Sequence, residues 1–91
     1  MNNANNNKMK TSKDLNKQLV SKNAGYKYVY EINNTRFEIC EYNECRGWCL
    51  NTYELSCLGN MQLKDSYGYE GFLLRDCKST ILSLWNSNEI K

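Results

Sequence analysis

The five cysteines have the most reactive side chains of this chain, and their spacing limits the chemistry open to them. They occupy positions 40, 45, 49, 57 and 77, and the sequence contains no histidine. Zinc modules hold paired ligands two to four residues apart, so only Cys45 and Cys49 have the spacing of a zinc knuckle. A site built from Cys40, Cys45, Cys49 and Cys57 is one interpretation. We prefer the other, small and partly buried thiols, because free cysteine packs as a small hydrophobe. We therefore expect no metal and no other cofactor.

Catalytic groups do not form a recognisable pattern. A nucleophilic cysteine needs a neighbouring base or cation to lower its pKa, and the pair that we consider, Cys45 beside Arg46, falls in a predicted loop. The glutamates alternate along predicted strands, which is typical of a solvated face rather than of an acid and base pair. No Lys-Ser or Lys-Thr follows the glycines at the step of a phosphate loop. We expect the protein not to be an enzyme.

Tyrosines and glutamates together favour a protein-binding surface. The chain has seven tyrosines, and tyrosine is enriched at interfaces because it joins a large apolar body to a polar tip. Charged rims around tyrosines suit a partner with a basic surface. The contacts we predict are Glu38, Glu41, Tyr42, Glu44 and Tyr53.

The charge distribution provides the alternative. Residues 1–25 carry five lysines and one aspartate, whereas residues 26–57 carry three basic and five acidic groups. A sheet that binds nucleic acid is expected to be basic, because phosphate neutralisation supplies most of the affinity. A nucleic-acid interface would therefore use the N-terminal lysines: Lys8, Lys10, Lys13, Lys17 and Lys22.

A three-stranded antiparallel meander between residues 26 and 57 is the element that must position these groups. Asn33-Asn34 predicts a two-residue type I′ turn, which sets Tyr30 opposite Phe37 and Tyr28 opposite Ile39. A one-residue slip would mix apolar and charged side chains on both faces, so the register is specified. The third strand, from about Arg46 to Tyr53, is expected to pair Ile39 with Leu50 and Cys40 with Cys49.

One helix is expected before the meander in the sequence and one after it. Thr11 and Asp14 have the spacing of a capping box, and the helix that they start is predicted to end at Gly25, with Leu15, Leu19 and Val20 as its apolar stripe. A second helix from Leu73 or Leu74 to Trp85 is predicted to cover the aromatic face of the sheet. Its stripe consists of Leu74, Cys77, Ile81, Leu84 and Trp85.

The predicted domain organisation is a flexible tail over residues 1–10 and one α+β domain over residues 11–91. Met61 to Lys64 alternates and is a candidate fourth strand, with turns at Gly59-Asn60 and at Ser66-Tyr67-Gly68. No apolar run approaches the roughly 20 residues that cross a bilayer, and the N-terminus lacks the apolar region of a signal peptide. We expect a cytoplasmic protein with no membrane partner.

The order of elements resembles two families that bind nucleic acid. Helix, three strands and helix is similar to double-stranded-RNA-binding domains. Glu70-Gly71-Phe72 leading into a helix is similar to the DNA-binding arm domains of phage integrases. These resemblances imply, as the alternative function, a small dsRNA- or DNA-binding regulatory domain.

In type, the chain resembles small phage-encoded inhibitors of the anti-CRISPR kind. It is a short single domain with fourteen asparagines, no histidine and an acidic, tyrosine-bearing sheet. The resemblance implies a non-enzymatic inhibitor, encoded by a phage or mobile element and acting in the cytoplasm of the host cell. Its partner would be a host protein that binds nucleic acid, such as a CRISPR-type nuclease, with the inhibitor covering its recognition site.

Overall fold

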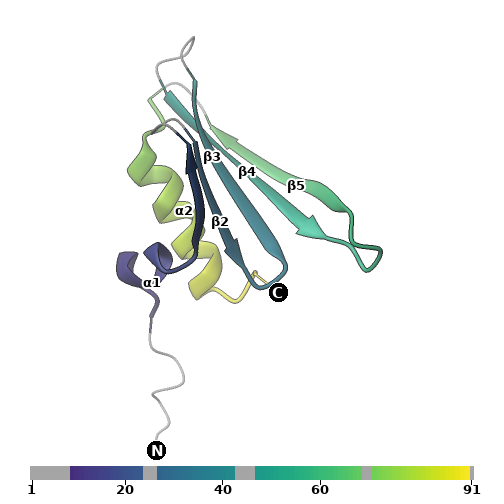
Figure 1. The fold of residues 1–91 in the computed structure, drawn as a ribbon. Coiled ribbons are helices and arrows are strands. Elements are labelled where there is room, and N and C mark those ends of the chain that lie inside the picture. Colours follow the sequence, from purple (N-terminus) through teal and green to yellow (C-terminus); the bar gives the residue numbers. More distant parts are fainter. Residues whose placement is uncertain (1–8, 24–26, 43–46, 69–70, 91) are drawn as a thin grey trace, which may run out of the picture.

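The computed structural model describes residues 9–23, 27–42, 47–68 and 71–90, apart from the side chain of Tyr42. Within them, a five-stranded antiparallel sheet packs against two helices (Figure 1). The elements in chain order are α1 (Ser12–Asn16), β1 (Leu19–Asn23), β2 (Lys27–Ile32), β3 (Thr35–Tyr42), β4 (Gly47–Leu55), β5 (Met61–Gly68) and α2 (Leu74–Asn86). Each strand pairs with the next in sequence, so the sheet is a meander. The α+β class is confirmed, and the expected three or four strands are corrected to five.

The β2–β3 hairpin has the predicted register, with Tyr30 opposite Phe37 and Tyr28 opposite Ile39. Asn33 has a φ of 55°, a left-handed conformation that asparagine tolerates better than most residues. Asn34 is not among the described residues with positive φ. Positive φ at the first central position alone is the pattern of a type II′ turn, which replaces the expected type I′ turn.

The β3–β4 register also agrees with the sequence prediction, although the loop between these strands has no two-residue turn to fix it. Ile39 pairs with Leu50, and Cys40 pairs with Cys49. Because side chains alternate along a strand, Ile39 and Leu50 point to the face that α2 covers, and the two cysteines point to the other face. We call these the inner face and the outer face.

The core lies between α2 and the inner face of the central strands, as predicted. Cys77 and Ile81 of α2 have no exposed surface, and they pack with four buried sheet residues, Tyr30, Phe37, Ile39 and Leu50. The other members of the predicted helical stripe, Leu74, Leu84 and Trp85, are partly buried against this core. Leu15 of α1 is also buried and extends the core on the N-terminal side, and Ile32, Phe72 and Ile90 complete it.

Both helices begin with the same hydrogen bond. The Asp14 carboxylate accepts the Thr11 N–H at 2.8 Å in α1, and the Asp76 carboxylate accepts the Leu73 N–H at 2.8 Å in α2. The Thr11 N–H holds the pKa of the Asp14 carboxyl below its usual value. Each aspartate also places negative charge at the positive end of its helix. In the part of the chain described, neither helix is long and apolar enough to cross a membrane.

The first helix is much shorter than predicted, because a strand replaces its second half. α1 ends at Asn16, and Leu19–Asn23 form β1, which pairs with β2. The expected helical stripe buries only Leu15, while Leu19 and Val20 are exposed. One buried leucine gives an isolated helix little tertiary stabilisation. Pairing with β2 instead satisfies the backbone, beginning where the Glu31 N–H donates to the Gln18 carbonyl at 3.1 Å.

The candidate fourth strand is present, and it is longer than the Met61–Lys64 segment that suggested it. β5 continues to Gly68, so the turn expected at Ser66-Tyr67-Gly68 is wrong. The turn at Gly59-Asn60 is confirmed, with Gly59 at a φ of 85° and the Ser56 N–H donating to the Asn60 carbonyl at 2.8 Å. Figure 1 shows the β4–β5 hairpin reaching away from α2.

Replacing Ile81 by alanine tests the packing of α2 on the sheet. Ile81 has no exposed surface, so the substitution should lower the free energy of unfolding by about 2–5 kcal/mol through lost burial and a cavity. Urea denaturation measures the change. Leu58→Ala is the control, because Leu58 is 83% exposed and its loss should cost less than about 0.5 kcal/mol. Equal stability of the two variants would contradict the assignment of the core.

Candidate protein-binding surface

The outer face of the sheet carries a linked group of charges on β2 and β3. Glu38 forms ion pairs with Lys27 at 3.2 Å and with Arg36 at 3.0 Å, and Arg36 also pairs with Glu31 at 3.3 Å. The side chain of Glu38 is only 17% exposed. The group contains two cations and two anions, so this part of the outer face is neutral rather than acidic.

The titration of Glu38 reflects this pairing. Partial burial of the carboxylate acts to raise its pKa, but the hydrogen bonds and positive charges of Lys27 and Arg36 outweigh it and lower the pKa below the usual value. Glu38 therefore stays ionised, with its charge already balanced inside the protein. It organises the outer face more than it attracts a basic partner.

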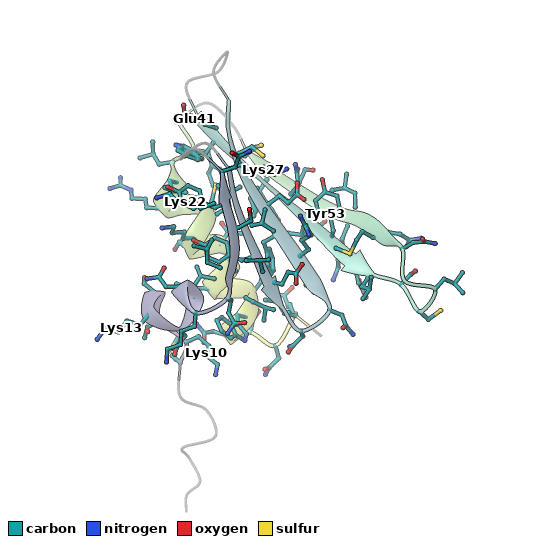
Figure 2. All side chains as sticks on the ribbon, in the orientation of Figure 1. Lys10, Lys13, Lys22, Lys27, Glu41 and Tyr53 are labelled. Atoms are coloured by element: carbon teal, nitrogen blue, oxygen red, sulfur yellow. The ribbon has the colours of Figure 1, made fainter. Side chains whose placement is uncertain are left out.

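The structure places the side chains of three of the five predicted contact residues, two on the outer face and one on the inner face. Glu38 and Tyr53 lie on the outer face, on neighbouring strands. Glu41 pairs with Trp48, whose side chain packs against the core, so Glu41 belongs to the inner face, with an exposed side chain at the end of the sheet (Figure 2). The side chain of Tyr42 and all of Glu44 fall outside the described residues.

An apolar patch occupies the outer face of the β4–β5 hairpin, next to the charged group. Tyr53 pairs with Leu63, and Leu55 pairs with Met61, so the four side chains share one face. Leu63 is 59% exposed, and Leu55 and Met61 are both more than 40% exposed. We call these four residues the apolar patch. Apart from Tyr53, they were not predicted as site residues.

A β-bulge at Lys64 creates this patch. The register of β4 with β5 shifts between Thr52 and Tyr53, so that Asp65 faces Thr52 but Leu63 faces Tyr53. If the same residues continued the register of Thr52 and Asp65 without a shift, Leu63 would face Glu54 and point to the inner face. A bulge changes the direction of the side chains beyond it, and bulges are frequent beside functional sites. Here it moves Leu63 and Met61 to the outer face.

The free edges of the sheet are protected against further strand pairing. β1 and β5 are the two edge strands, each has a bulge-type shift in its register, and each contains a lysine, Lys22 and Lys64. Bulges and edge lysines are devices by which proteins prevent edge-to-edge association. Contacts with a partner should therefore use a face of the sheet.

The cysteines that the structure describes do not lie together as a metal site would require. Cys40 and Cys49 are neighbours on the outer face, whereas Cys57 lies beyond the end of β4, separated from Cys49 by six strand residues, or about 20 Å. Cys45 falls outside the described residues. Among the residues that the structure describes, no cluster of three or more potential ligands is close enough to bind a metal ion.

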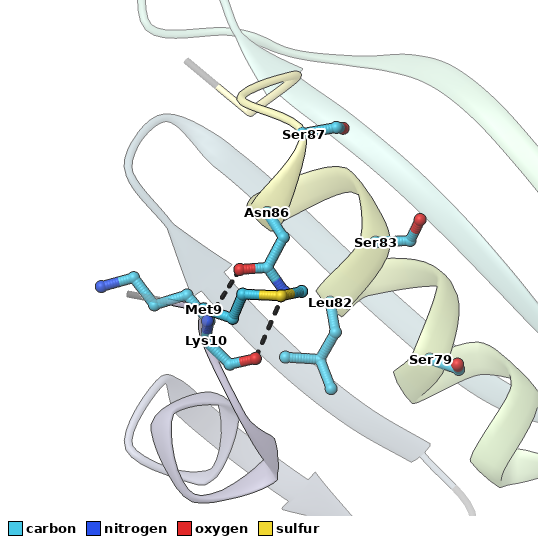
Figure 3. A pocket seen from close by; sticks show the side chains of 7 residues that line it. All are labelled: Met9, Lys10, Ser79, Leu82, Ser83, Asn86 and Ser87. Atoms are coloured by element: carbon cyan, nitrogen blue, oxygen red, sulfur yellow. Dashed lines mark hydrogen bonds between the residues drawn. The ribbon is translucent and has the colours of Figure 1, made fainter. Parts of the chain in front are cut away.

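The N-terminal lysines lie along α1, β1 and the adjoining side of α2. Lys10 is tied to α2, since its N–H donates to the Asn86 side chain at 2.7 Å and its carbonyl accepts from Asn86 at 3.2 Å (Figure 3). Lys13, Lys17 and Lys22 are exposed, and Lys8 falls outside the described residues. Figure 2 shows Lys10, Lys13 and Lys22 toward α1 and β1, away from Tyr53.

An open depression of about 500 Å³ adjoins Lys10 on the outer side of α2. Its lining is apolar and hydroxyl-bearing: Met9, Lys10, Ser79, Leu82, Ser83, Asn86 and Ser87. Figure 3 shows Met9 and Leu82 side by side, with the serines along one side of the helix. The depression contains one ionisable side chain, so its lining offers no acid and base pair.

The Cys77 thiol should make the stability of the protein depend on alkaline pH. Burial, with smaller contributions from Cys49 and Asp76, raises its pKa from 9.0 to about 12. Above pH 9 the thiol ionises in the unfolded chain but not in the folded one, so stability falls as the pH rises from 9 toward 12, by at most about 1.4 kcal/mol per pH unit. Urea denaturation of reduced protein at pH 8 and pH 11 measures this loss. Cys77→Ala should reduce it and the exposed-site control Cys57→Ala should not; an identical loss in both variants would contradict the prediction.

Comparison of the chain with protein-family models, with curated proteins and with solved structures finds no match.

Proposed function

We propose that the protein is a non-enzymatic binding module that docks on a partner protein through the outer face of its β4–β5 hairpin. The observation that carries the proposal is the bulge at Lys64, which turns Leu63 and Met61 outward beside Tyr53 and Leu55. With a regular register these side chains would instead point to the inner face, away from Tyr53 and Leu55. The outward direction of Leu63 and Met61 is explained if this surface contacts a partner.

The composition of the apolar patch supports a protein partner. Interface centres are apolar, rich in tyrosine and methionine and poor in charge, and a polar rim surrounds them. The patch has these features, with the charged group of Glu31, Arg36 and Glu38 beside it on the outer face. Burying one leucine of the patch would contribute about 1.5–3 kcal/mol to binding.

The charge of the sheet supports a basic surface around the apolar contact on the partner. Residues 27–68 contain four basic and six acidic side chains, a net charge of −2. Opposite charge at the rim speeds association and fixes orientation more than it adds affinity. Glu41 is an exposed acidic group on the inner face at the opposite end of the sheet, and the predicted contact Glu44 falls outside the described residues.

A module of this kind acts stoichiometrically, by occupying its partner's surface. This is the mode of action of the phage-encoded inhibitors that the chain resembles in size and composition. Our proposal therefore includes inhibition of a host nucleic-acid-binding protein, a CRISPR-type nuclease being the case that the resemblance suggests. The partner must offer an apolar spot with a basic surround.

Replacing Leu63 by lysine tests the surface. If Leu63 is buried in the complex, the charge should weaken binding by at least about 10-fold to 100-fold, in line with the loss of one buried leucine. The matched control is Val20→Lys, which introduces the same charge at an exposed apolar position, 56% exposed, on the opposite edge strand. Both variants should unfold at the temperature of the unmodified chain.

The measurement is affinity capture from host extract with each variant immobilised, followed by titration of the captured protein against each variant. A partner retained by Val20→Lys and lost by Leu63→Lys supports the proposal. Equal capture by both variants, and by the double variant Leu55→Lys with Leu63→Lys, would remove the apolar patch from consideration.

A further inference from the structure

A second surface, on the side of the molecule away from the apolar patch, concentrates positive charge. Residues 9–23, together with α2, contain six basic and two acidic side chains, a net charge of +4. The basic side chains are Lys10, Lys13, Lys17, Lys22, Arg75 and Lys78. We call them the basic rim, because they follow the border between the β1 edge of the sheet and α2.

Among the described residues, the cations of the basic rim form no ion pair, and only the charges of Lys10 and Lys17 act on a carboxyl group, by helping to lower the pKa of Asp14. Every ion pair among the described residues involves Lys27, Arg36 or Lys64, all of which are on the sheet. In the part of the chain that the structure describes, Lys27, Arg36 and Lys64 are therefore paired with carboxylates, whereas the cations of the basic rim are not. Unpaired cations gathered on one side are the electrostatic footprint of a surface that binds an anion.

Aromatic rings hold three of these lysines in place. The ammonium groups of Lys22 and Lys78 each lie 5.4 Å from the centre of the Tyr28 ring, and that of Lys10 lies 5.2 Å from the centre of a Trp85 ring. Attraction between a cation and a ring positions the charge without neutralising it. Two cations that share one ring also repel each other, and an anion bound nearby would reduce that repulsion.

A bulge places Lys22 in this arrangement. The β1–β2 register shifts between Leu19 and Ser21, so that Lys22 faces Tyr28. Without the shift, Lys22 would face Lys27 on the outer face. The bulge thus moves a cation from the neutral outer face to the border with α2, as the bulge on β5 moves the apolar residues outward.

The spacing of the fixed lysines suits a polymer of phosphates. Lys78 and Trp85 are two helical turns apart, or about 10 Å along α2, so Lys10 and the pair of Lys22 and Lys78 are separated by a similar distance. Each strand of duplex DNA carries a charge about every 3.4 Å along its axis. A row of cations at this spacing can meet several phosphates of one strand.

We infer that the basic rim binds the phosphate backbone of nucleic acid without reading its sequence. Tyr28 and Trp85 are partly buried and covered by lysines, so they support the cations rather than stack on bases. The inference does not depend on the proposed protein contact, which uses other residues on the other side of the sheet.

The test is fluorescence anisotropy with a labelled 20-base-pair DNA of arbitrary sequence, titrated with the full chain between 50 and 200 mM salt. With six phosphate contacts, the logarithm of the binding constant should fall against the logarithm of salt concentration with a slope of about −5, a loss of about 10³-fold over this range. A second duplex of unrelated sequence should bind equally well.

The variant Lys22→Gln with Lys78→Gln should reduce that slope by about 2 and weaken binding at 50 mM salt, because it removes two phosphate contacts. The control is Lys64→Gln, because Lys64 of β5 is already paired with Glu54 of β4 and lies outside the basic rim. This variant should bind like the unmodified chain. Circular dichroism establishes that each variant is folded.

Three results would overturn the inference. The first is an absence of binding at 50 mM salt, and the second is equal binding by the double variant and the unmodified chain. The third is displacement of the DNA by poly-glutamate at the same concentration of charge as by unlabelled DNA, which would assign the basic rim to an acidic protein.

Discussion

The packing of α2 on the inner face of the sheet is the interaction on which the rest of the structure depends. α2 has 13 residues and is about 20 Å long, whereas β4 has nine residues and extends for about 30 Å. The helix therefore cannot cover the full length of the sheet. Ile90 extends the cover to the level of Thr35 and Thr52, around a small cavity. Beyond that level neither described helix lies over the inner face of the β4–β5 hairpin, so Leu63 and Met61 can point outward beside Tyr53 and Leu55 without loss to the core.

Two β-bulges then decide which side chains each surface receives. Each lies on an edge strand, where an extra residue disrupts the fewest ladder hydrogen bonds. On β5 the bulge turns Leu63 and Met61 outward, and on β1 it turns Lys22 toward Tyr28. The same irregularities also discourage edge pairing. One device thus directs side chains to the faces and closes the edges to other strands.

Residue patterns were sufficient to predict the centre of the fold and not its edges. Alternation along β2 and β3, with Asn33 at the turn, specified a register that any slip would spoil, and the periodicity from Leu74 to Trp85 specified α2. β1 was missed because Leu19 and Val20 follow a capping signal at helical spacing, and only pairing with β2 favours the strand. The apolar patch was missed because strict alternation places Met61 and Leu63 on the same face as Tyr67, and no residue type in β5 announces the bulge. The neutralisation of the Glu38 charge by Lys27 and Arg36 could be predicted only in part, since the register places Glu31, and not Glu38, opposite Arg36.

The separation of charge across the molecule gives the two surfaces a relation to each other. Residues 27–68 carry a net charge of −2, while residues 9–23 together with α2 carry a net charge of +4. A polyanion is therefore repelled by the sheet side and attracted to the side of β1 and α2. A basic protein surface has the opposite preference. Electrostatics alone thus orients the molecule between a protein and a polyanion. Such an orientation matters most where both are present together, as in a protein that is itself bound to nucleic acid. There the apolar patch would face the protein and the basic rim would face the phosphates.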